Sequence, residues 1–237
     1  MLSFIVTHRN RELQLIDYVE NIHRFYPNAE IVISEQRNTN VFLQGQLFNL
    51  AFPHSHGDII ILMDVDIRFS NTIDFEKWMG VLKHPFIGYD RIFNCDENKK
   101  ILNIRPGTDR THGGCCVFTR DQFIDSCGYS NLMCDWGAED DILDIRVNGF
   151  KRIHNSLLHI YHEKRKSSIT YPRNRIMYET EKKRDKKLDG WKQTTAKLKD
   201  KQQGYNSIYL VFDEITVTKD FAYLNLLKDN YERKNTF

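Results

Sequence analysis

Two acidic clusters hold the side chains best suited to chemistry. The first, Asp64-Val65-Asp66, directly follows the apolar run Ile59–Met63. A buried strand that ends there places carboxylates at the edge where open α/β sheets bind ligands, and alternation along the strand would point Asp64 and Asp66 to the same side. Two like charges so close favour a divalent cation with a diphosphate. The alternative is a strand that ends in a solvated acidic turn.

The second cluster is Asp135-Trp136-Gly137-Ala138-Glu139-Asp140-Asp141, which predicts the start of a helix. A carboxylate at this place can cap the helix, interact with its dipole, or act as a general base near a substrate hydroxyl. Three consecutive acids exceed what capping requires. Trp136 suits stacking on a sugar or closing a lid, and equally suits a core anchor.

Two histidines follow at His159 and His162. Imidazole is a common metal ligand, and His159 would face the same side as His162 only in a helical or turned segment. The His-Glu-x-x-His order of zinc proteases is absent. An isolated histidine is more often structural, so this pair gains weight only by joining the acids.

The elements that must position these residues alternate between strands and helices, which predicts an α/β fold. In the first part of the chain we expect strands at Leu2–Val6, Glu30–Ser34, Asp58–Met63 and Phe86–Tyr89, and helices at Arg11–Tyr26, Leu43–Phe52 and Asp74–Leu82. The first helix would bury residues spaced three apart: Leu13, Ile16, Val19, Ile22 and Phe25.

In the second part, the Gly113–Phe118 strand is expected to run into a helix at Arg120–Ser126. A helix at Glu139–Asn148 and a strand at Arg152–His154 follow. Residues 173–203 are polar and predicted to be helical, and the chain ends with β segments at Ser207–Phe212 and Ile215–Leu224.

The composition is that of a globular protein. The 237 residues are 41% hydrophobic and 12% aromatic, with 12 Gly and 5 Pro, which excludes collagenous and wholly disordered chains. No apolar run approaches the ~20 residues that cross a bilayer, and the first residues lack the pattern of a secretion signal. Five cysteines without a Cys-x-x-Cys pair indicate reduced thiols and a cytoplasmic protein.

Charge is unevenly distributed. Residues 1–150 hold 14 basic and 21 acidic side chains, a net of −7, whereas residues 151–237 hold 20 and 11, a net of +9. Between Lys164 and Lys201 there are 14 basic and 5 acidic residues. This segment could attract phosphates or an acidic membrane surface, although a solvated face is the more common meaning of such a run. No nucleic-acid-binding module is recognisable.

Taken in order, these motifs resemble the catalytic domain of the β-1,4-galactosyltransferase family. The resemblance spans nearly the whole chain and rests on an ordered set of motifs: His8-Arg9-Asn10-Arg11, Leu47–Phe52, Asp64-Val65-Asp66, Gly113-Gly114, Gln122-Phe123, Trp136–Asp141, His162 and Gly204–Ser207. It implies the GT-A glycosyltransferase fold, a Rossmann-like mixed central sheet flanked by helices. Residues 1–237 would form a single catalytic domain, with a nucleotide-binding half at 1–110 and an acceptor and catalytic half at 111–237 that includes a basic mobile loop at about 163–203.

The resemblance also implies roles for individual residues. Asp140 matches the catalytic base and Glu139 its acceptor-binding neighbour. Asp66 and His162 would ligate Mn²⁺, and His159 stands where the family usually has a methionine ligand. The nucleotide and donor would be held by Arg9, Arg11, Asp64, Gly114 and Trp136.

The implied reaction is inverting transfer of a hexose (Gal, GalNAc or GlcNAc) from a UDP-sugar to a saccharide or lipid-linked glycan acceptor. Thr111 replaces the bulky tyrosine of galactose-specific members, which would widen the donor pocket, and Gln44 replaces an expected basic residue. Three alternatives remain: a polysaccharide transferase like the chondroitin polymerases, a metal-dependent phosphoester hydrolase, and a silent glycan-binding protein. Because no secretory anchor is recognised, we expect a cytoplasmic enzyme, with the basic region as a contact for the inner membrane surface.

Overall fold

The computed structural model describes residues 1–37, 42–96, 98–106, 113–131, 133, 137–160, 171–182, 192, 194–204 and 207–217. Its helices are α1 (Glu12–Phe25), α2 (Gln44–Ala51), the 3-10 turn η1 (Phe52–His54), α3 (Phe75–Leu82), α4 (Arg120–Ser126), α5 (Glu139–Arg146) and α6 (Tyr171–Glu181). Its strands are β1 (Leu2–His8), β2 (Glu30–Gln36), β3 (Ile59–Asp64), β4 (Ile67–Phe69), β5 (Phe86–Ile87), β6 (Arg91–Cys95), β7 (Ile101–Pro106), β8 (Cys115–Thr119), β9 (Lys151–Arg152), β10 (Ser156–Ile160), β11 (Thr194–Gly204) and β12 (Ser207–Val217).

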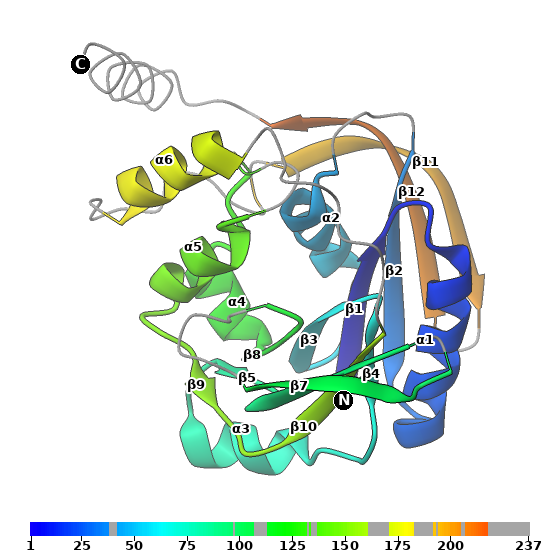
Figure 1. Cartoon of the computed structure of the whole chain (residues 1–237). Helices are drawn as coiled ribbons and strands as arrows, with labels where there is room; N and C mark the ends of the chain where they lie inside the picture. Colours follow the sequence, from blue (N-terminus) through cyan, green and yellow to red (C-terminus); the bar gives the residue numbers. More distant parts are fainter. Residues whose placement is uncertain are drawn as a thin grey trace.

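The central sheet has eight strands in the order β11-β12-β2-β1-β3-β8-β5-β9 (Figure 1). Strands β12, β2, β1 and β3 are parallel, and β8 runs antiparallel to β3. The expected mixed α/β sheet is therefore confirmed. The carboxyl ends of β1 and β3 lie side by side, with Thr7 in register with Asp64.

Helices α1 and α2 cover opposite faces of this sheet (Figure 1). The buried face of α1 is formed by Leu15, Tyr18 and Ile22. The predicted apolar stripe is wrong for Leu13 and Ile16, which are 80% and 57% exposed. Steps of three residues fall about 60° short of a full turn, so three steps back from Ile22 place Leu13 on the opposite side of the helix.

A second sheet has four strands, ordered β4-β10-β6-β7, of which β4, β6 and β7 were not predicted. Its strand β4 is attached to the central sheet by an aromatic cluster. Ring centroids 5.1–6.1 Å apart link Phe4 of β1 with Tyr26, Phe69 of β4 and Phe75. Each such pair adds about 0.5–1.5 kcal/mol beyond its buried area. The cluster therefore holds the turn between β3 and β4, residues 65–66, in place.

The carboxyl-terminal prediction is corrected at two points. Residues 173–203 are not one helical stretch: α6 ends at Glu181, and β11 begins at Thr194. Within the described residues, β11 is the end strand of the sheet and pairs with β12, and polar sequences are common in edge strands. The two expected late β segments are instead one strand, β12, which ends at Val217. The rest of the second segment lies outside the described residues.

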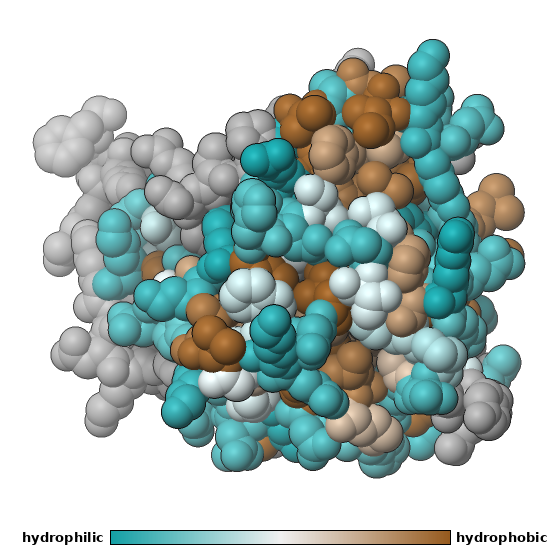
Figure 2. All heavy atoms as spheres, turned by 90° about the horizontal axis from the view of Figure 1, so that it is seen from below, coloured by the Kyte–Doolittle hydropathy of each residue, from teal (hydrophilic) through white to brown (hydrophobic). Residues whose placement is uncertain are grey.

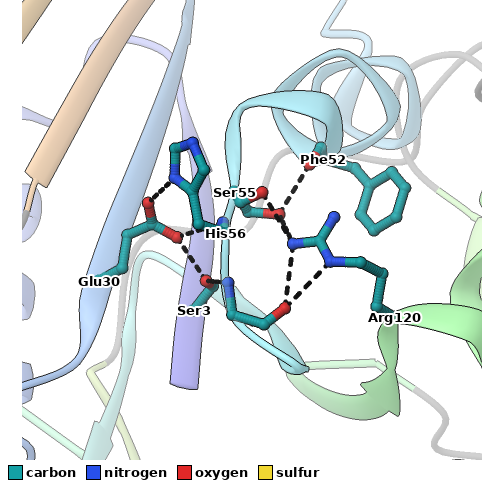
Figure 3. Close-up of polar contacts among 7 residues, drawn as sticks. Ser3, Glu30, Phe52, Ser55, His56 and Arg120 are labelled. Carbon is teal, nitrogen blue, oxygen red and sulfur yellow. Dashed lines mark hydrogen bonds and ion pairs between the residues drawn. The ribbon is translucent and has the colours of Figure 1, made fainter. Parts of the chain in front are cut away.

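Polar contacts join the amino ends of the parallel strands, at the opposite edge from Asp64 (Figure 3). Glu30 of β2 accepts hydrogen bonds from Ser3 of β1 and from the backbone N–H and ring of His56. Arg120, at the start of α4, donates to the carbonyl oxygens of Ser55 and Gly57 at 2.7 and 3.0 Å. These contacts stabilise the fold and leave the carboxyl edge free for a site.

The large apolar side chains that the structure shows exposed are Met1, two on α1, Val81 on α3, and Ile101, Leu102 and Ile104 on β7. On the face shown in Figure 2, apolar groups are set among hydrophilic ones. Within the described ranges, no helix has the length and hydropathy needed to span a membrane. The described cysteines, Cys95, Cys115, Cys116 and Cys127, are free thiols, as predicted.

Candidate active site

The pair Asp64 and Asp66 occupies the carboxyl end of β3. Strand β3 ends at Asp64, and residues 65–66 form a turn, so strand alternation is the wrong reason for their proximity. The Asp64 carboxylate accepts a hydrogen bond from Gln44 Nε2 at 2.6 Å. The Asp66 carboxylate, buried to 7% exposure, pairs with Arg11 at 2.6 Å. Each carboxylate thus has its own hydrogen-bond partner.

The turn that carries Asp66 is held by a fully buried arginine. Arg68 of β4 donates to the carbonyls of Val65 and Ile67 at 2.8 and 2.7 Å. It also donates to the Gln14 carbonyl of α1 at 2.6 Å and pairs with Asp17 at 2.7 Å. A buried guanidinium with these partners stabilises a single turn conformation because moving the turn would leave its donors unpaired.

The ring of His159 lies beside Asp66. His159, on β10, pairs in register with Ile67, and its Nε2 is 3.9 Å from Asp66 Oδ2. Its Nδ1 is 2.9 Å from Asn94 Oδ1. Asn94 Nδ2 donates to Asn103 Oδ1, which orients the Asn94 oxygen toward the ring. A proton on Nδ1 therefore satisfies this contact and leaves the Nε2 lone pair directed at the Asp66 side, the arrangement typical of a metal-binding histidine.

The carboxylate of Asp140 projects from the first turn of α5, as expected. Its Oδ1 accepts a hydrogen bond from Tyr129 Oη at 3.2 Å. Its Oδ2 lies so close to Gly113 that a Cβ built there would be 2.1 Å away. The neighbouring Glu139 is buried, and its Oε2 accepts the Gly137 N–H at 2.8 Å. Glu139 therefore contacts the backbone just before α5, whereas Asp140 is partly exposed at the site.

The Gly113-Gly114 segment joins the two acidic clusters. The Gly114 carbonyl accepts the backbone N–H of Asp64 at 3.1 Å, and Tyr89 Oη donates to the Gly113 carbonyl at 2.6 Å. Gly114 has φ +93°, a conformation that favours glycine. This segment brings the end of β3 and the start of α5 to one place.

Helix α2 supports the same site through buried amides. Gln44 holds Asp64, and Gln46 donates to the carbonyls of Asn131 and Met133, both at 2.6 Å. Asn49 donates to the Tyr129 carbonyl and accepts its N–H, at 2.9 and 3.0 Å. The segment before the second acidic cluster is therefore fastened to the helix that contacts the first.

Electrostatics show that the acids share one environment. Burial raises the pKa of Asp64 to about 8, and the charges of Asp66 and Asp140 add to the rise. Burial likewise raises the pKa of Asp140 to about 8, and Glu139 contributes. The pKa of Glu139 rises to about 7, mainly through burial. Such an excess of carboxylate charge favours binding of a cation.

The two arginines predicted to bind the nucleotide, Arg9 and Arg11, lie between β1 and α1. Arg9 lies over the Phe42 ring at 5.3 Å from its centroid. Arg11, one residue before α1, is bound to Asp66 and one-third exposed. Both follow the carboxyl end of β1, and Arg11 is the one with an observed contact to a carboxylate of the pair.

Some predicted site residues lie outside the described residues: Trp136, His162, Thr111 and the segments 161–170 and 183–191. Across the described part of the chain, no group of three His, Cys, Asp or Glu side chains could hold a metal ion. Of the predicted ligands, the structure brings together Asp66 and His159. The described residues of the predicted mobile loop, about 163–203, form α6 and most of β11.

Sequence reasoning missed Tyr129, Asn94 and Arg68. None stands in a motif, and each contacts its partner from a separate element. Gln44 was noted only as a departure, yet it binds Asp64. The one signal that could have drawn attention to α2 is its amides, Gln44, Gln46 and Asn49, in a helix that is otherwise mainly apolar.

The chain is similar in sequence to curated β-1,4-galactosyltransferases. It is 27% identical over 154 residues to β-1,4-galactosyltransferase 4 of Mus musculus and 28% identical to that of Homo sapiens. The aligned region is 62% of this chain and 42% of each relative, so it spans less than half of their length. No protein-family model matches the chain.

The fold is similar to that of solved glycosyltransferases. The catalytic domain of Drosophila β1,4-galactosyltransferase 7, in complex with xylobiose, superposes with a TM-score of 0.65 at 18% identity, covering 95% of this chain and 98% of that one. TarS of S. aureus with UDP-GlcNAc gives 0.55 at 12% identity, covering 76% and 66%. The predicted resemblance to the β-1,4-galactosyltransferase family and the GT-A fold is confirmed.

Proposed function

We propose, from this similarity to β-1,4-galactosyltransferases, that the chain is a metal-dependent hexosyltransferase. It would move a hexose from a UDP-sugar to a saccharide hydroxyl, with inversion at the anomeric carbon. The observation that carries the proposal is the convergence of three distant stretches: Asp64 and Asp66, Asp140, and His159. The charge of Asp140 contributes to the raised pKa of Asp64, which supports their placement around one site.

The donor set fits a divalent cation. Asp66 offers a carboxylate oxygen and His159 a nitrogen 3.9 Å from it, and oxygen with imidazole is a suitable combination for Mn²⁺. A variant of the Drosophila enzyme has been solved with manganese, UDP-Gal and xylobiose, at a TM-score of 0.63 and 17% identity. We assign Asp66 and His159 as ligands here, and His162 as a third. When bound, the cation would neutralise the charge of the departing nucleoside diphosphate.

The chain's own residues would do the remaining work. Arg9 and Arg11 present planar donors suited to phosphate oxygens, and Asp64 would lie on the nucleotide side. Gly114 would allow the backbone to approach the donor, and Trp136 would cover the diphosphate and sugar. In this proposal residues 1–237 act as a single catalytic domain.

Asp140 would take the proton of the acceptor hydroxyl as its oxygen attacks the anomeric carbon. Its Oδ1 is engaged by Tyr129, which leaves Oδ2 for the substrate. Glu139, next to it in the first turn, would help to hold the acceptor. A positioned base contributes about 10²–10⁴-fold to the rate, and the remainder would come from orientation and electrostatic stabilisation.

The donor can be narrowed experimentally. UDP-Gal, UDP-GalNAc and UDP-GlcNAc are screened by thermal shift with and without Mn²⁺, followed by mass spectrometry of trial saccharide acceptors, xylobiose included. We expect stabilisation by a UDP-sugar only with the cation present, and a product heavier by one hexose or N-acetylhexosamine. Phosphate release from nucleotides without sugar transfer would contradict the proposal.

The base is tested by Asp140→Asn, with Asp144→Asn on the same helix as the control. We expect Asp140→Asn to lower kcat by about 10²–10⁴-fold while calorimetry shows unchanged binding of UDP with Mn²⁺. The control variant should transfer sugar normally. Full transfer by a folded Asp140→Asn protein would show that Asp140 is not the base.

A further inference from the structure

Tyr129 makes the hydrogen bond that orients Asp140. Its hydroxyl lies 3.2 Å from Asp140 Oδ1, and within the described residues no other hydrogen bond to this carboxylate is observed. The other oxygen, Oδ2, lies over Gly113, where the absence of a side chain leaves room for it. The two oxygens of Asp140 therefore have different environments: one is held, and the other is open toward the glycine segment.

Tyr129 is itself held rigidly. Its backbone N–H and carbonyl both pair with the side chain of Asn49, at 3.0 and 2.9 Å. Its ring stacks on Phe48, with centroids 5.3 Å apart and planes at 16°. The residue is 3% exposed. The hydroxyl is thus fixed to α2, an element separate from the helix that carries Asp140.

The phenol can act only as a donor to a carboxylate. Burial raises the pKa of Tyr129 well above its ordinary value, and the charge of Asp140 raises it further. The proton therefore stays on Tyr129 throughout the working pH range. A hydrogen bond from a neutral donor to an ionised acceptor is stronger than one between neutral groups, and it favours the charged form of the acid.

We propose that Tyr129 is a positioning residue for the base Asp140, holding Oδ1 so that Oδ2 faces the acceptor hydroxyl. This inference rests on the proposed function, because it takes Asp140 as the base. It adds to that function a residue that touches neither donor nor acceptor. It also explains why the α2 amides fasten residues 129–133.

The contact opposes the neighbours that disfavour ionisation of Asp140. Burial, Glu139 and Asp141 raise the pKa of Asp140, and the Tyr129 hydrogen bond lowers it. Asp64 faces it from the end of β3. Among the residues that the structure describes, Tyr89 and Cys116 also interact with it. Loss of the hydroxyl therefore moves the acid limb of the rate profile to higher pH, since the base must be ionised to act.

The test is Tyr129→Phe, which keeps the stacked ring and removes one oxygen. Tyr26→Phe is the matched control: Tyr26 is also buried, and its hydroxyl bonds to the backbone of Ile73, in the aromatic cluster away from α5. We expect Tyr129→Phe to lower kcat roughly 10- to 100-fold, the range for a hydrogen bond to a charged group. KM for the UDP-sugar and binding of UDP with Mn²⁺ should stay unchanged. The control should lose thermal stability but keep kcat.

The pH profile and an activity-independent titration complete the test. The acid limb of kcat should move upward in Tyr129→Phe, and difference infrared spectra against Asp140→Asn should show the same upward shift for the Asp140 carboxyl. Wild-type kcat and an unmoved acid limb in Tyr129→Phe would overturn the inference while Asp140→Asn remains inactive. If Asp140→Asn retains full transfer, the proposal that Asp140 is the base is wrong. The infrared shift would then still show whether Tyr129 lowers the pKa of Asp140.

Discussion

Replacing Gly113 by alanine should separate catalysis from folding. A Cβ at this position would lie 2.1 Å from Asp140 Oδ2 and 2.9 Å from its Cγ. Ordinary contact begins at 3.4 Å, so the oxygen must retreat by the difference, about 1.3 Å. The backbone cannot retreat instead without breaking the 2.6 Å hydrogen bond from Tyr89 to the Gly113 carbonyl. The end of the Asp140 side chain is therefore the part that moves.

The two costs of this displacement differ in size. A carboxylate can rotate, so the loss of stability should stay at the lower end of the overpacking range, about 1–2 kcal/mol. A misplacement of 1 Å at a reacting group, by contrast, can lower the rate by about 10²-fold. We therefore expect kcat of Gly113→Ala to fall about 100-fold, with KM for the UDP-sugar changed little.

The assay is sugar transfer at saturating donor, with unfolding followed by urea titration. Gly80→Ala is the control, because Gly80 lies in α3 with no atom within 4 Å of a built Cβ, and the substitution should leave kcat unchanged and add up to about 1 kcal/mol of stability. Transfer by Gly113→Ala within threefold of the wild type would refute the reasoning. A loss confined to UDP binding would show that Asp140 is not what the new methyl group displaces.

Three further variants test the supports of the site and of the fold. Asn94→Ala should weaken Mn²⁺ binding about 10- to 100-fold by calorimetry because His159 loses the partner that orients its ring; unchanged affinity would exclude His159 as an oriented ligand. Burial would raise the pKa of Glu30, but its hydrogen bonds hold it below the ordinary 4.5, so wild-type stability should fall as the pH drops below that value. Urea titrations from pH 3 to 7 should show a weaker fall of stability in Glu30→Gln than in the wild type. An equal fall in both proteins would show that Glu30 does not cause the loss of stability. Arg120→Met should cost about 1.5–3 kcal/mol of stability by removing the donor to the carbonyls of Ser55 and Gly57, with kcat unchanged. A loss of kcat would show that this edge is coupled to the site.

The acidic clusters were predictable because their signals are local. Asp64 follows an apolar run that predicts a buried strand, and Asp140 follows a small-residue turn that opens a helix. The role predicted for each of these carboxylates depends only on the local secondary structure around it. The relation between the clusters came from family resemblance and not from any physical pattern in the chain.

The supporting residues were not predictable in this way. Tyr129 has no meaning as a motif until Asn49 and Phe48, some 80 residues earlier, fasten it beside Asp140. The ring of His159 is oriented by Asn94, which β6 places next to it. The polar segment at 194–204 becomes a strand because β12 offers it an edge to pair with.

The amino-acid sequence by itself determined the alternation of strands and helices, the positions of the carboxylates, and a likeness to a family. Those properties follow from periodicity and residue type over a few turns of chain. Tertiary structure decided which oxygen of Asp140 accepts the Tyr129 hydrogen bond, which nitrogen of His159 faces Asp66, and how strongly burial raises the carboxylate pKa values. Each of these depends on contacts between segments far apart in the chain, and on the exclusion of water that only the packed fold provides.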